Sequence, residues 1–579
     1  MTPKLQISQL VINRLKLLEN VCGGGLFGLM YSKNLIILGF DLESSDKLNF
    51  KKMQDNFPTE IDLCGLFKFD DCTDVKAHMQ EILINVDITD NPILIKCQRK
   101  DDGELELNAS QWKNGKLEEI VYEVLSEEEI YKQFVMARLL GYIEIAAEPN
   151  EKSIKQEFMT TRKKLAYGNV LFQLQSKNVF FNNNEIVGAP VSLVSDIFDL
   201  VKKKVENVDK KKNKKETALT DFQMVNIDCL VKKSDEFEKN QQAALNLILE
   251  KNKVLIPITI DAIAAVHITT KALGLYDILI ESLCRTLRLI EENLLDQLVE
   301  CDELAVPLTY HFKPDNFGHY YTCIYPQSIP DEDEHLTAFR RELHQQFSLS
   351  MVRPVFRRAN AFPFDVITSS LLVNPHVGLK NTVEGGKQSL VQGKYSYHHY
   401  MQDKFNDDGW GCAYRSLQTL CSWFRFQGYS EHPIPSHEDI QKYLVKVGDK
   451  PKTFVNSRQW IGSTEVSMCL NGFMNVDSRI MHVSSGTELA SKGSELAYHF
   501  ESQGTPIMIG GGVLAHTIIG VDFNSNTGEL KFLILDPHFT GDDDLQVVQN
   551  KGWCGWKGVN FWNKTAYYNL CMPQRPAIF

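Results

Sequence analysis

The sequence contains no apolar run long enough to cross a bilayer and no recognisable secretory signal. The most apolar window, Val254–Ala265, is too short for a transmembrane helix and is interrupted by Pro257 and Asp261. The first residues, Met1–Leu18, have neither a continuous apolar stretch nor a small-residue cleavage site. We therefore expect no direct transmembrane segment, and any membrane association should come through a partner protein or a lipid.

Paired cysteine motifs are also missing. The 13 cysteines are an odd number, and no two of them form a Cys-x-x-Cys pair. In a long chain without a secretory signal, this usage predicts free thiols in a reducing compartment rather than a disulfide framework. No pair of histidines has zinc-ligand spacing beside a cysteine, so we expect neither a bound metal nor another cofactor.

Positive charge is scarce over the chain as a whole. The formal net charge is -12, which argues against a general nucleic-acid binder because such a protein needs a basic face. The exception is a lysine-rich run within residues 202–215, which has almost no apolar content. This run is typical of a solvated linker. A basic segment that binds anionic lipid or RNA is the alternative.

The chain is too long for one hydrophobic core. Its 579 residues predict about three or four domains. Changes in composition indicate an α/β domain at residues 1–200, the lysine-rich linker at residues 201–216 and a second α/β region at residues 217–347. A C-terminal domain at residues 374–579 holds the tryptophan-glycine clusters.

Hydrophobic periodicity predicts several elements in the first two regions. Helices are expected at Ser126–Leu140 and Tyr276–Leu298. Strands are expected at Leu26–Met30, Leu35–Phe40, Ile61–Phe69, Val306–Phe312 and Tyr320–Tyr325. The first two strands flank a short polar turn, and the last two flank a Pro-Asp-Asn-Phe-Gly segment. Each of these pairs should therefore form a hairpin.

Histidines are concentrated in the last region. Only His78 falls within the first 250 residues, whereas nine histidines lie from His376 onward. Chemistry that needs an imidazole is therefore expected in the C-terminal domain.

One cysteine of this domain has unusual neighbours. Cys412 follows the glycine-rich turn Asp407–Gly411 and begins a stretch with a single apolar face. The apolar positions of this face are Tyr414, Leu417, Leu420, Cys421 and Phe424. A thiol at a helix N-terminus lies at the positive end of the helix dipole, which favours the nucleophilic thiolate. Cys412 is therefore a candidate nucleophile, although most intracellular cysteines are buried structural residues.

A carboxylate and a histidine with matching context follow a predicted strand, Lys531–Leu535. Asp536 and His538 are two residues apart in a segment that Pro537 biases towards an extended conformation, so their side chains should leave the same face. Asp536 could thus orient His538 as the base that serves Cys412.

His516 is a rival for the role of base. A hairpin between Lys531–Leu535 and the predicted strand Thr517–Phe523 would bring His516 close to Asp536. Spacing favours His538 but leaves His516 open. It also cannot choose an oxyanion donor among the tyrosines just upstream of Cys412, which are Tyr395, Tyr397 and Tyr400.

Several segments resemble those of a known family, the Ufm-specific cysteine proteases. They read YSYHHYMQD, NDDGWGCAYRSLQT, GGGVLAHTIIG, LDPHFTG and GWCGWKG, and all lie within about the last 200 residues. The resemblance implies that Cys412 is the nucleophile, His538 the base and acid, and Asp536 the residue that orients it. It also implies that Tyr400 donates to the oxyanion and that His516 only supports the pair.

The resemblance further implies an α+β chain with a papain-like domain at its C-terminus. Such a protein processes the C-terminus of the ubiquitin-fold modifier Ufm and removes Ufm from conjugates. The N-terminal extension is similar to that of the longer type of the family and more weakly resembles an MPN-like domain. This domain should be non-catalytic, because no His-x-His metal motif occurs in the first 250 residues. That half should dock on a membrane-anchored adaptor, which would place the protein in the cytoplasm at the cytosolic face of the endoplasmic reticulum.

Two other functions compete with this one. GWGC and DPH also occur in the autophagins, which act on a lipidated ubiquitin-like modifier, although the Ala-Tyr-Arg-Ser continuation favours the Ufm group. The second alternative is a catalytically silent adaptor.

Overall fold

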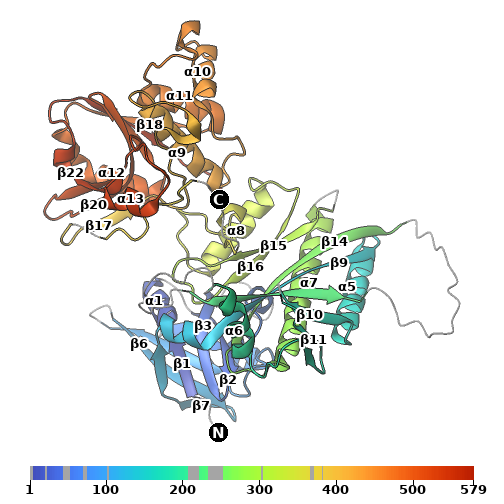
Figure 1. Ribbon diagram of the computed structural model, residues 1–579. Helices are drawn as coiled ribbons and strands as arrows, with labels where there is room; N and C mark the ends of the chain where they lie inside the picture. The colour runs from blue at the N-terminus through green and yellow to red at the C-terminus, as the bar shows by residue number, and fades with distance from the viewer. Residues whose placement is uncertain are drawn as a thin grey trace. The chain divides into compact units, whose positions relative to one another are not determined.

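The computed structural model describes most of the chain. The residues outside the description are 1–3, 20–22, 43–52, 70–74, 101–103, 176, 206–220, 233–251, 301–303, 365–370 and 381–382. The chain forms two compact units, Met1–Met351 and Val352–Phe579, and each is described by itself (Figure 1).

An eight-stranded sheet forms the first part of the N-terminal unit, with strand order β7-β6-β5-β4-β2-β3-β1-β8. In chain order its strands are β1 (Lys4–Ser8), β2 (Gly23–Tyr31), β3 (Asn34–Leu42), β4 (Asp62–Phe69), β5 (Ile93–Arg99), β6 (Leu105–Lys113), β7 (Lys116–Glu119) and β8 (Tyr122–Leu125). β2 and β3 pair antiparallel around a turn in which Ser32 and Lys33 have φ angles of 44° and 75°. The strands predicted within β2, β3 and β4 are confirmed, as is the first hairpin.

A six-stranded sheet forms the second part of this unit, with strand order β12-β11-β10-β13-β9-β14. Its strands are β9 (Phe134–Ala147), β10 (Val170–Leu174), β11 (Phe180–Phe181), β12 (Ile186–Val187), β13 (Gln223–Val231) and β14 (Val254–His267). Helices α5 (Glu151–Ala166) and α7 (Gly274–Glu300) pack on each other and on this sheet. Helix α7 confirms the helix predicted from its apolar stripe.

The second predicted hairpin is also confirmed, because β15 (Pro307–Phe312) and β16 (Tyr321–Pro326) pair antiparallel. The predicted lysine-rich linker is only partly described. Residues 201–205 belong to helix α6 (Val194–Val205), and residues 206–216 lie outside the described part of the chain.

The helix predicted at Ser126–Leu140 is wrong beyond its first turns. Helix α4 (Glu127–Gln133) begins at a capping box formed by Ser126 and Glu129, as the sequence favours. From Phe134 the chain becomes strand β9, which pairs antiparallel with β14 over its whole length and parallel with β13. The apolar residues of this segment fit a buried strand as well as a helix. Partner strands on both sides supply its backbone hydrogen bonds, and this tertiary pairing decides the structure.

A seven-stranded antiparallel sheet forms the core of the C-terminal unit. Its order is β18-β23-β19-β20-β21-β22, and β17 also pairs with β20. The strands are β17 (Lys387–Leu390), β18 (Ser478–Val483), β19 (Ile507–Gly511), β20 (Leu514–Phe523), β21 (Leu530–Leu535), β22 (Cys554–Gly558) and β23 (Tyr568–Pro573). β20 and β21 form the predicted hairpin, so the register continues from Thr517 opposite Leu535 towards His516 and Asp536.

Helix α9 (Cys412–Phe426) lies at the centre of this unit. It packs against β19, β20 and helix α11 (Ser463–Met474), and every residue from Cys412 to Phe424 is buried. The other long helices, α10 (His437–Lys446) and α12 (Gly493–Ser502), pack on α11 and on β20, respectively. The sequence predicts one apolar face for α9, but the helix is enclosed on all sides, which fixes its N-terminus against the sheet.

Candidate active site

A tight glycine turn places Cys412 at the start of helix α9, as predicted. Gly411 is the N-cap residue, and Gly409 adopts a φ of 78°, which favours glycine. A Cβ on Gly411 would lie 2.6 Å from side-chain atoms of Asp407. Both glycines are therefore needed for the turn. Cys412 is 8% exposed, so its thiol is enclosed but accessible, and it lies in the first helical turn.

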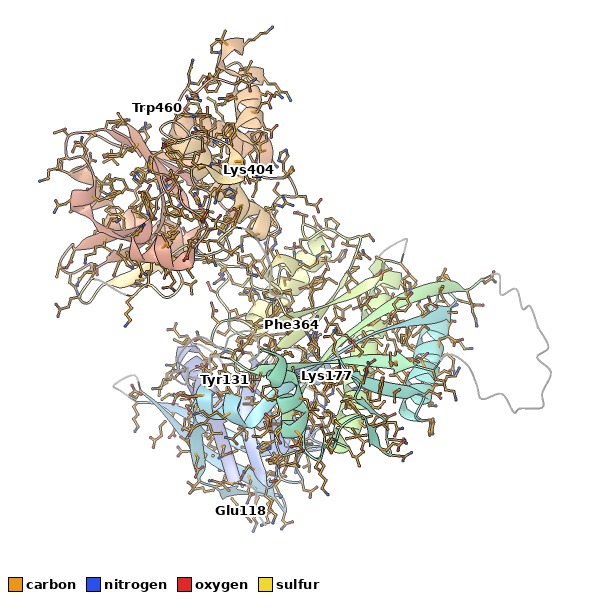
Figure 2. The ribbon with its side chains drawn as sticks, in the orientation of Figure 1. Glu118, Tyr131, Lys177, Phe364, Lys404 and Trp460 are labelled. Atoms are coloured by element: carbon orange, nitrogen blue, oxygen red, sulfur yellow. The ribbon has the colours of Figure 1, made fainter. Side chains whose placement is uncertain are left out.

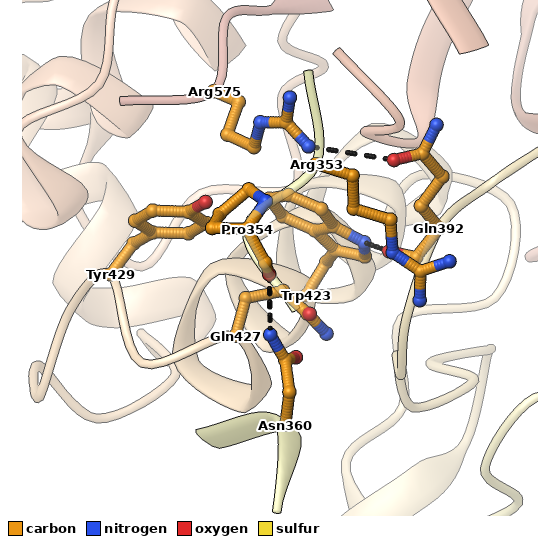
Figure 3. Close-up of a pocket in the computed structure, with 8 residues that line it drawn as sticks. All are labelled: Arg353, Pro354, Asn360, Gln392, Trp423, Gln427, Tyr429 and Arg575. Atoms are coloured by element: carbon orange, nitrogen blue, oxygen red, sulfur yellow. Dashed lines mark hydrogen bonds between the residues drawn. The ribbon is translucent and has the colours of Figure 1, made fainter. Parts of the chain in front are cut away.

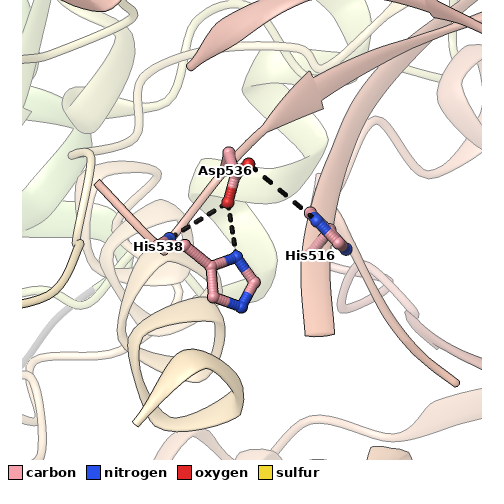
Figure 4. Close-up of side chains that lie close together, drawn as sticks. All are labelled: His516, Asp536 and His538. Atoms are coloured by element: carbon pink, nitrogen blue, oxygen red, sulfur yellow. Dashed lines mark hydrogen bonds and ion pairs between the residues drawn. The ribbon is translucent and has the colours of Figure 1, made fainter. Parts of the chain in front are cut away.

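Strand β21 ends immediately before Asp536 and His538. The Asp536 N–H donates to the carbonyl of Trp553 at 2.7 Å, which fixes the chain where it leaves the sheet. The His538 N–H donates to Asp536 Oδ1 at 3.0 Å, and His538 Nδ1 lies 2.6 Å from the same oxygen (Figure 4). A carboxylate at Nδ1 leaves Nε2 as the ring nitrogen for Cys412. The predicted pairing of Asp536 with His538 is therefore present.

Cys412 and His538 interact, and each shifts the pKa of the other. Burial by itself raises the pKa of the Cys412 thiol, but the neighbouring His538 outweighs it and lowers the pKa, with help from Tyr400 and the Ala515 backbone. Burial by itself lowers the pKa of His538, but Asp536 and Cys412 raise it to about 9. The two side chains therefore favour a thiolate beside an imidazolium, which is the reactive state of a thiol nucleophile.

The structure also brings Tyr400 to Cys412. The Tyr400 hydroxyl hydrogen-bonds to the Cys412 sulfur, and burial and the nearby thiol raise the pKa of this phenol well above its ordinary value. Tyr400 therefore remains a protonated donor. Its backbone N–H donates to the carbonyl of Pro537 at 2.9 Å, and its ring meets the His538 ring edge-on at 5.3 Å. All four residues predicted for the site, Cys412, Asp536, His538 and Tyr400, thus lie together.

His516 occupies a different place, beside the second oxygen of Asp536. Its Nε2 lies 3.9 Å from Asp536 Oδ2, which is too long for a direct hydrogen bond (Figure 4). Burial lowers the pKa of His516 to about 4, so the ring is neutral near pH 7. His538 holds the shorter contact with Asp536 and is the histidine whose pKa is raised by Cys412. The geometry thus separates the two histidines that spacing left open.

His516, Asp536 and His538 are also the group of described side chains that could ligate a metal ion, with their ligand atoms within 4.8 Å of one another. Two imidazoles and a carboxylate are a ligand set that zinc accepts. Here the Nδ1 of His538 already faces Asp536 at 2.6 Å, which is the arrangement of a base with its orienting carboxylate.

Sequence reasoning missed three groups around the site. The Tyr397 hydroxyl donates to the carbonyl of Asp536, and the Ala515 backbone contacts the Cys412 thiol. Asp407 is fully buried and bonds to both sides of the Cys412 turn. Only its position two residues before the GWGC segment could have drawn attention to Asp407. The other two groups depend on contacts between distant segments.

The tryptophans of the C-terminal unit differ in how far they are buried. Trp410 is buried and packs edge-on against Tyr414, whereas Trp553 and Trp556 are half-buried against the core. Trp460, which precedes α11, is 55% exposed at the surface of the C-terminal unit (Figure 2).

A small pocket lies elsewhere in the C-terminal unit (Figure 3). Its lining residues are Arg353, Pro354, Asn360, Gln392, Trp423, Gln427, Tyr429 and Arg575. Trp423 lies about three turns along α9 from Cys412. The Trp423 indole N–H donates to the Gln392 carbonyl at 2.8 Å. The pocket is therefore distinct from the Cys412 cluster.

Three family models match the chain. Residues 386–571 match peptidase family C78. Residues 1–130 match the insect UFM1-specific protease N-terminal MPN-like domain, and residues 155–366 match the N-terminal region of ubiquitin-fold modifier 1 specific protease 2.

Related proteins match over most or all of the chain. The chain is 47% identical over 612 residues to the probable Ufm1-specific protease 2 of Drosophila melanogaster, and the match covers 100% of both proteins. It is 43% identical over 466 residues to the Ufm1-specific protease 2 of Homo sapiens, covering 76% of this chain and 98% of the human protein. The crystal structure of UfSP from C. elegans has a TM-score of 0.67 at 23% identity and covers 100% of both chains.

The fold and the C78 match define a cysteine protease with a papain-like C-terminal domain. The predicted α+β fold class is thereby confirmed. The chain belongs to the Ufm1-specific protease 2 family, which confirms the resemblance noted in its motifs. Among the helices that the structure describes, none is both long enough and apolar enough to span a membrane.

Proposed function

We propose that this protein cleaves after the C-terminal residue of mature Ufm1, both in the Ufm1 precursor and in Ufm1 conjugates, with Cys412 as the nucleophile. One observation supports the assignment of roles above all others. The Cys412 thiol lies beside His538 and Tyr400, which both lower its pKa, while Asp536 holds Nδ1 of His538 at 2.6 Å. The relatives are Ufm1-specific proteases, which supports Ufm1 as the modifier.

The reaction follows from these positions. The Cys412 thiolate attacks the carbonyl carbon of the scissile amide, and the carbonyl electron pair moves onto oxygen. The Tyr400 hydroxyl and the Cys412 backbone N–H donate to this oxyanion. As the C–N bond breaks, the His538 imidazolium gives its proton to the leaving amine, and a thioester remains. His538 then takes a proton from water, and the resulting hydroxide attacks the thioester carbonyl. The C–S bond breaks, the Cys412 thiolate is restored beside the His538 imidazolium, and the acid product gives its proton to solvent.

The proposal is tested with two Ufm1 substrates. One carries a C-terminal peptide extension, and the other is joined to a lysine side chain through an isopeptide bond. We expect the purified full chain to cleave both, and we expect Cys412→Ala to cleave neither. Mass spectrometry of the products identifies the bond that is cut. Retained cleavage by Cys412→Ala would refute the assignment of the nucleophile.

The two rival functions give different outcomes in the same assay. Cleavage of an extended autophagy modifier, with Ufm1 left intact, would indicate an autophagin-like protease. A chain that forms no covalent adduct with a Ufm1 vinyl-sulfone probe would be the catalytically silent adaptor. The proposed function requires an adduct that Cys412→Ala abolishes.

We also propose that the N-terminal half docks on a membrane-anchored adaptor at the cytosolic face of the endoplasmic reticulum. The sequence of this half matches an MPN-like domain, and its first 250 residues contain no His-x-His pair for metal-dependent catalysis. The described helices provide no membrane span of their own. A docking role through a partner protein fits these three observations.

Co-sedimentation with microsomes tests this localisation. We expect the full chain to sediment with intact microsomes and to lose binding after trypsin removes their cytosolic proteins. Cys412→Ala should bind as the unmodified chain does. Equal binding to protein-free vesicles that contain anionic lipid would instead favour the lysine-rich run of residues 202–215 as the membrane contact.

A further inference from the structure

A buried carboxylate with no part in the proposed chemical steps lies next to the site. Asp407 is 0% exposed and precedes the glycine turn that leads to Cys412. Its side chain and its backbone carbonyl together contact two segments. One is the loop that follows Tyr400, and the other is the start of helix α9.

The first set of contacts holds the loop after Tyr400. Asp407 Oδ1 accepts a hydrogen bond from the Met401 N–H at 2.8 Å. Met401 has a φ of 64°, a left-handed conformation that a non-glycine residue rarely adopts without support. Its neighbour Gln402 offers its carbonyl to Arg415 Nη2 at 3.1 Å. The backbone next to Tyr400 is thus held by Asp407 and by the arginine that Asp407 binds.

The second set of contacts holds the turn before Cys412. Asp407 Oδ2 accepts a hydrogen bond from Arg415 Nε at 2.6 Å, and Arg415 lies one turn into helix α9. The Asp407 carbonyl accepts the N–H groups of Trp410 at 3.2 Å and Gly411 at 2.9 Å. Asp407 therefore fixes both the entry into the helix and its first turn.

The negative charge of Asp407 is balanced by the side chains around it. Arg415 is 1% exposed, and His437 Nε2 lies 3.0 Å from Asp407 Oδ2. Burial by itself raises the pKa of the Asp407 carboxyl, but the neighbouring His437 and the hydrogen bond and charge of Arg415 lower it overall. A buried charge pair whose members are hydrogen-bonded on several sides sets geometry rather than adding much stability.

We propose that Asp407 is a positioning residue that fixes the Tyr400 hydroxyl relative to Cys412. The inference rests on the proposed function, in which Tyr400 donates to the oxyanion. Tyr400 and Cys412 belong to different segments, and Asp407 bonds to the residue next to Tyr400 and to the helix that carries Cys412. A displacement of a catalytic group by about 1 Å can cost about 10²-fold in rate, so a residue that fixes this separation matters for turnover.

A double-mutant cycle tests whether Asp407 acts through Tyr400. The four proteins are the unmodified chain, Asp407→Asn, Tyr400→Phe and the double variant, assayed for kcat and KM on the extended Ufm1 substrate. We expect Asp407→Asn alone to lower kcat about 10- to 100-fold and to change KM by less than about twofold. In the Tyr400→Phe background the same change should cost less than about threefold, because the donor that Asp407 positions is already missing. The exposed neighbour offers the matched control Asp408→Asn, which should leave kcat unchanged.

A merely structural role predicts other results. Equal losses in both backgrounds would overturn the proposal, as would an Asp407→Asn loss that tracks the folded fraction in thermal melting. Because Asp407→Asn removes the buried partner of Arg415 and leaves it, among the described carboxylates, only Asp403 at 3.6 Å, the cycle is repeated with Asp407→Asn/Arg415→Gln, which removes both buried charges. If the loss in kcat caused by Asp407→Asn/Arg415→Gln is the same with and without Tyr400→Phe, the proposal is also overturned. Failure of the proposed function is seen separately, as cleavage that survives Cys412→Ala or is unaffected by Tyr400→Phe in the otherwise unmodified chain.

Discussion

Replacing His538 by glutamine is expected to lower kcat for Ufm1 cleavage by about 10²–10⁴-fold. His538 lies beside Cys412, which helps to raise its pKa, and it carries the proton that the leaving amine needs. Glutamine keeps a polar side chain of similar reach but cannot transfer a proton near neutral pH. The loss should therefore appear in kcat, with KM nearly unchanged, in steady-state cleavage of the extended substrate.

His516→Gln is the matched comparison, because both histidines lie beside Asp536. We expect His516→Gln to lower kcat by less than about tenfold, because neutral His516 lies 3.9 Å from the carboxylate and transfers no proton in the proposed reaction. The reverse ranking, with His516→Gln inactive and His538→Gln active, would show that the roles have been exchanged. Thermal melting of both variants separates loss of chemistry from loss of folded protein.

Asp536→Asn is expected to lower kcat/KM by up to about 10⁴-fold, as is typical when the carboxylate of a base–carboxylate pair is neutralised. Asp536 raises the pKa of His538 to about 9 through a hydrogen bond and its charge. Without that charge the imidazolium is less stable, so the His538 pKa should fall towards its ordinary value. The Cys412 pKa should rise in turn, because the thiolate then faces a neutral ring for more of the pH range.

Asp536→Asn should also shift the pH dependence of cleavage in a defined direction. In the unmodified chain, thiolate and imidazolium should coexist from below the ordinary thiol range up to about pH 9, where His538 loses its proton. Asp536→Asn should move the alkaline limb of kcat/KM to lower pH and slow the alkylation of Cys412 by iodoacetamide at pH 7. Asp542→Asn, at an exposed position nearby, should change neither profile. An alkaline limb that stays near pH 9 in Asp536→Asn would show that another group sets the His538 pKa.

Much of the fold follows from local patterns in the sequence. The apolar stripe of α7 repeats at the helical period, whereas β2, β3, β20 and β21 are short apolar runs on either side of polar turns. The segment from Phe134 could not be assigned in this way, because its apolar residues suit a helix or a buried strand equally. Its pairing with β13 and β14 decides the matter, and those strands lie far away in the chain.

The candidate site, like the fold, could be predicted only in part from the sequence. By itself the sequence determined that Cys412 begins a helix after a glycine turn, that Asp536 and His538 leave β21 on one face, and that His516 lies across the hairpin. Each of these statements depends on residues close together or on a single hairpin register. Only the tertiary structure decided which histidine lies beside Cys412, that Tyr400 reaches the same sulfur, and that Asp407 links the two segments. Those contacts join distant parts of the chain through buried hydrogen bonds, which leave no period in the sequence.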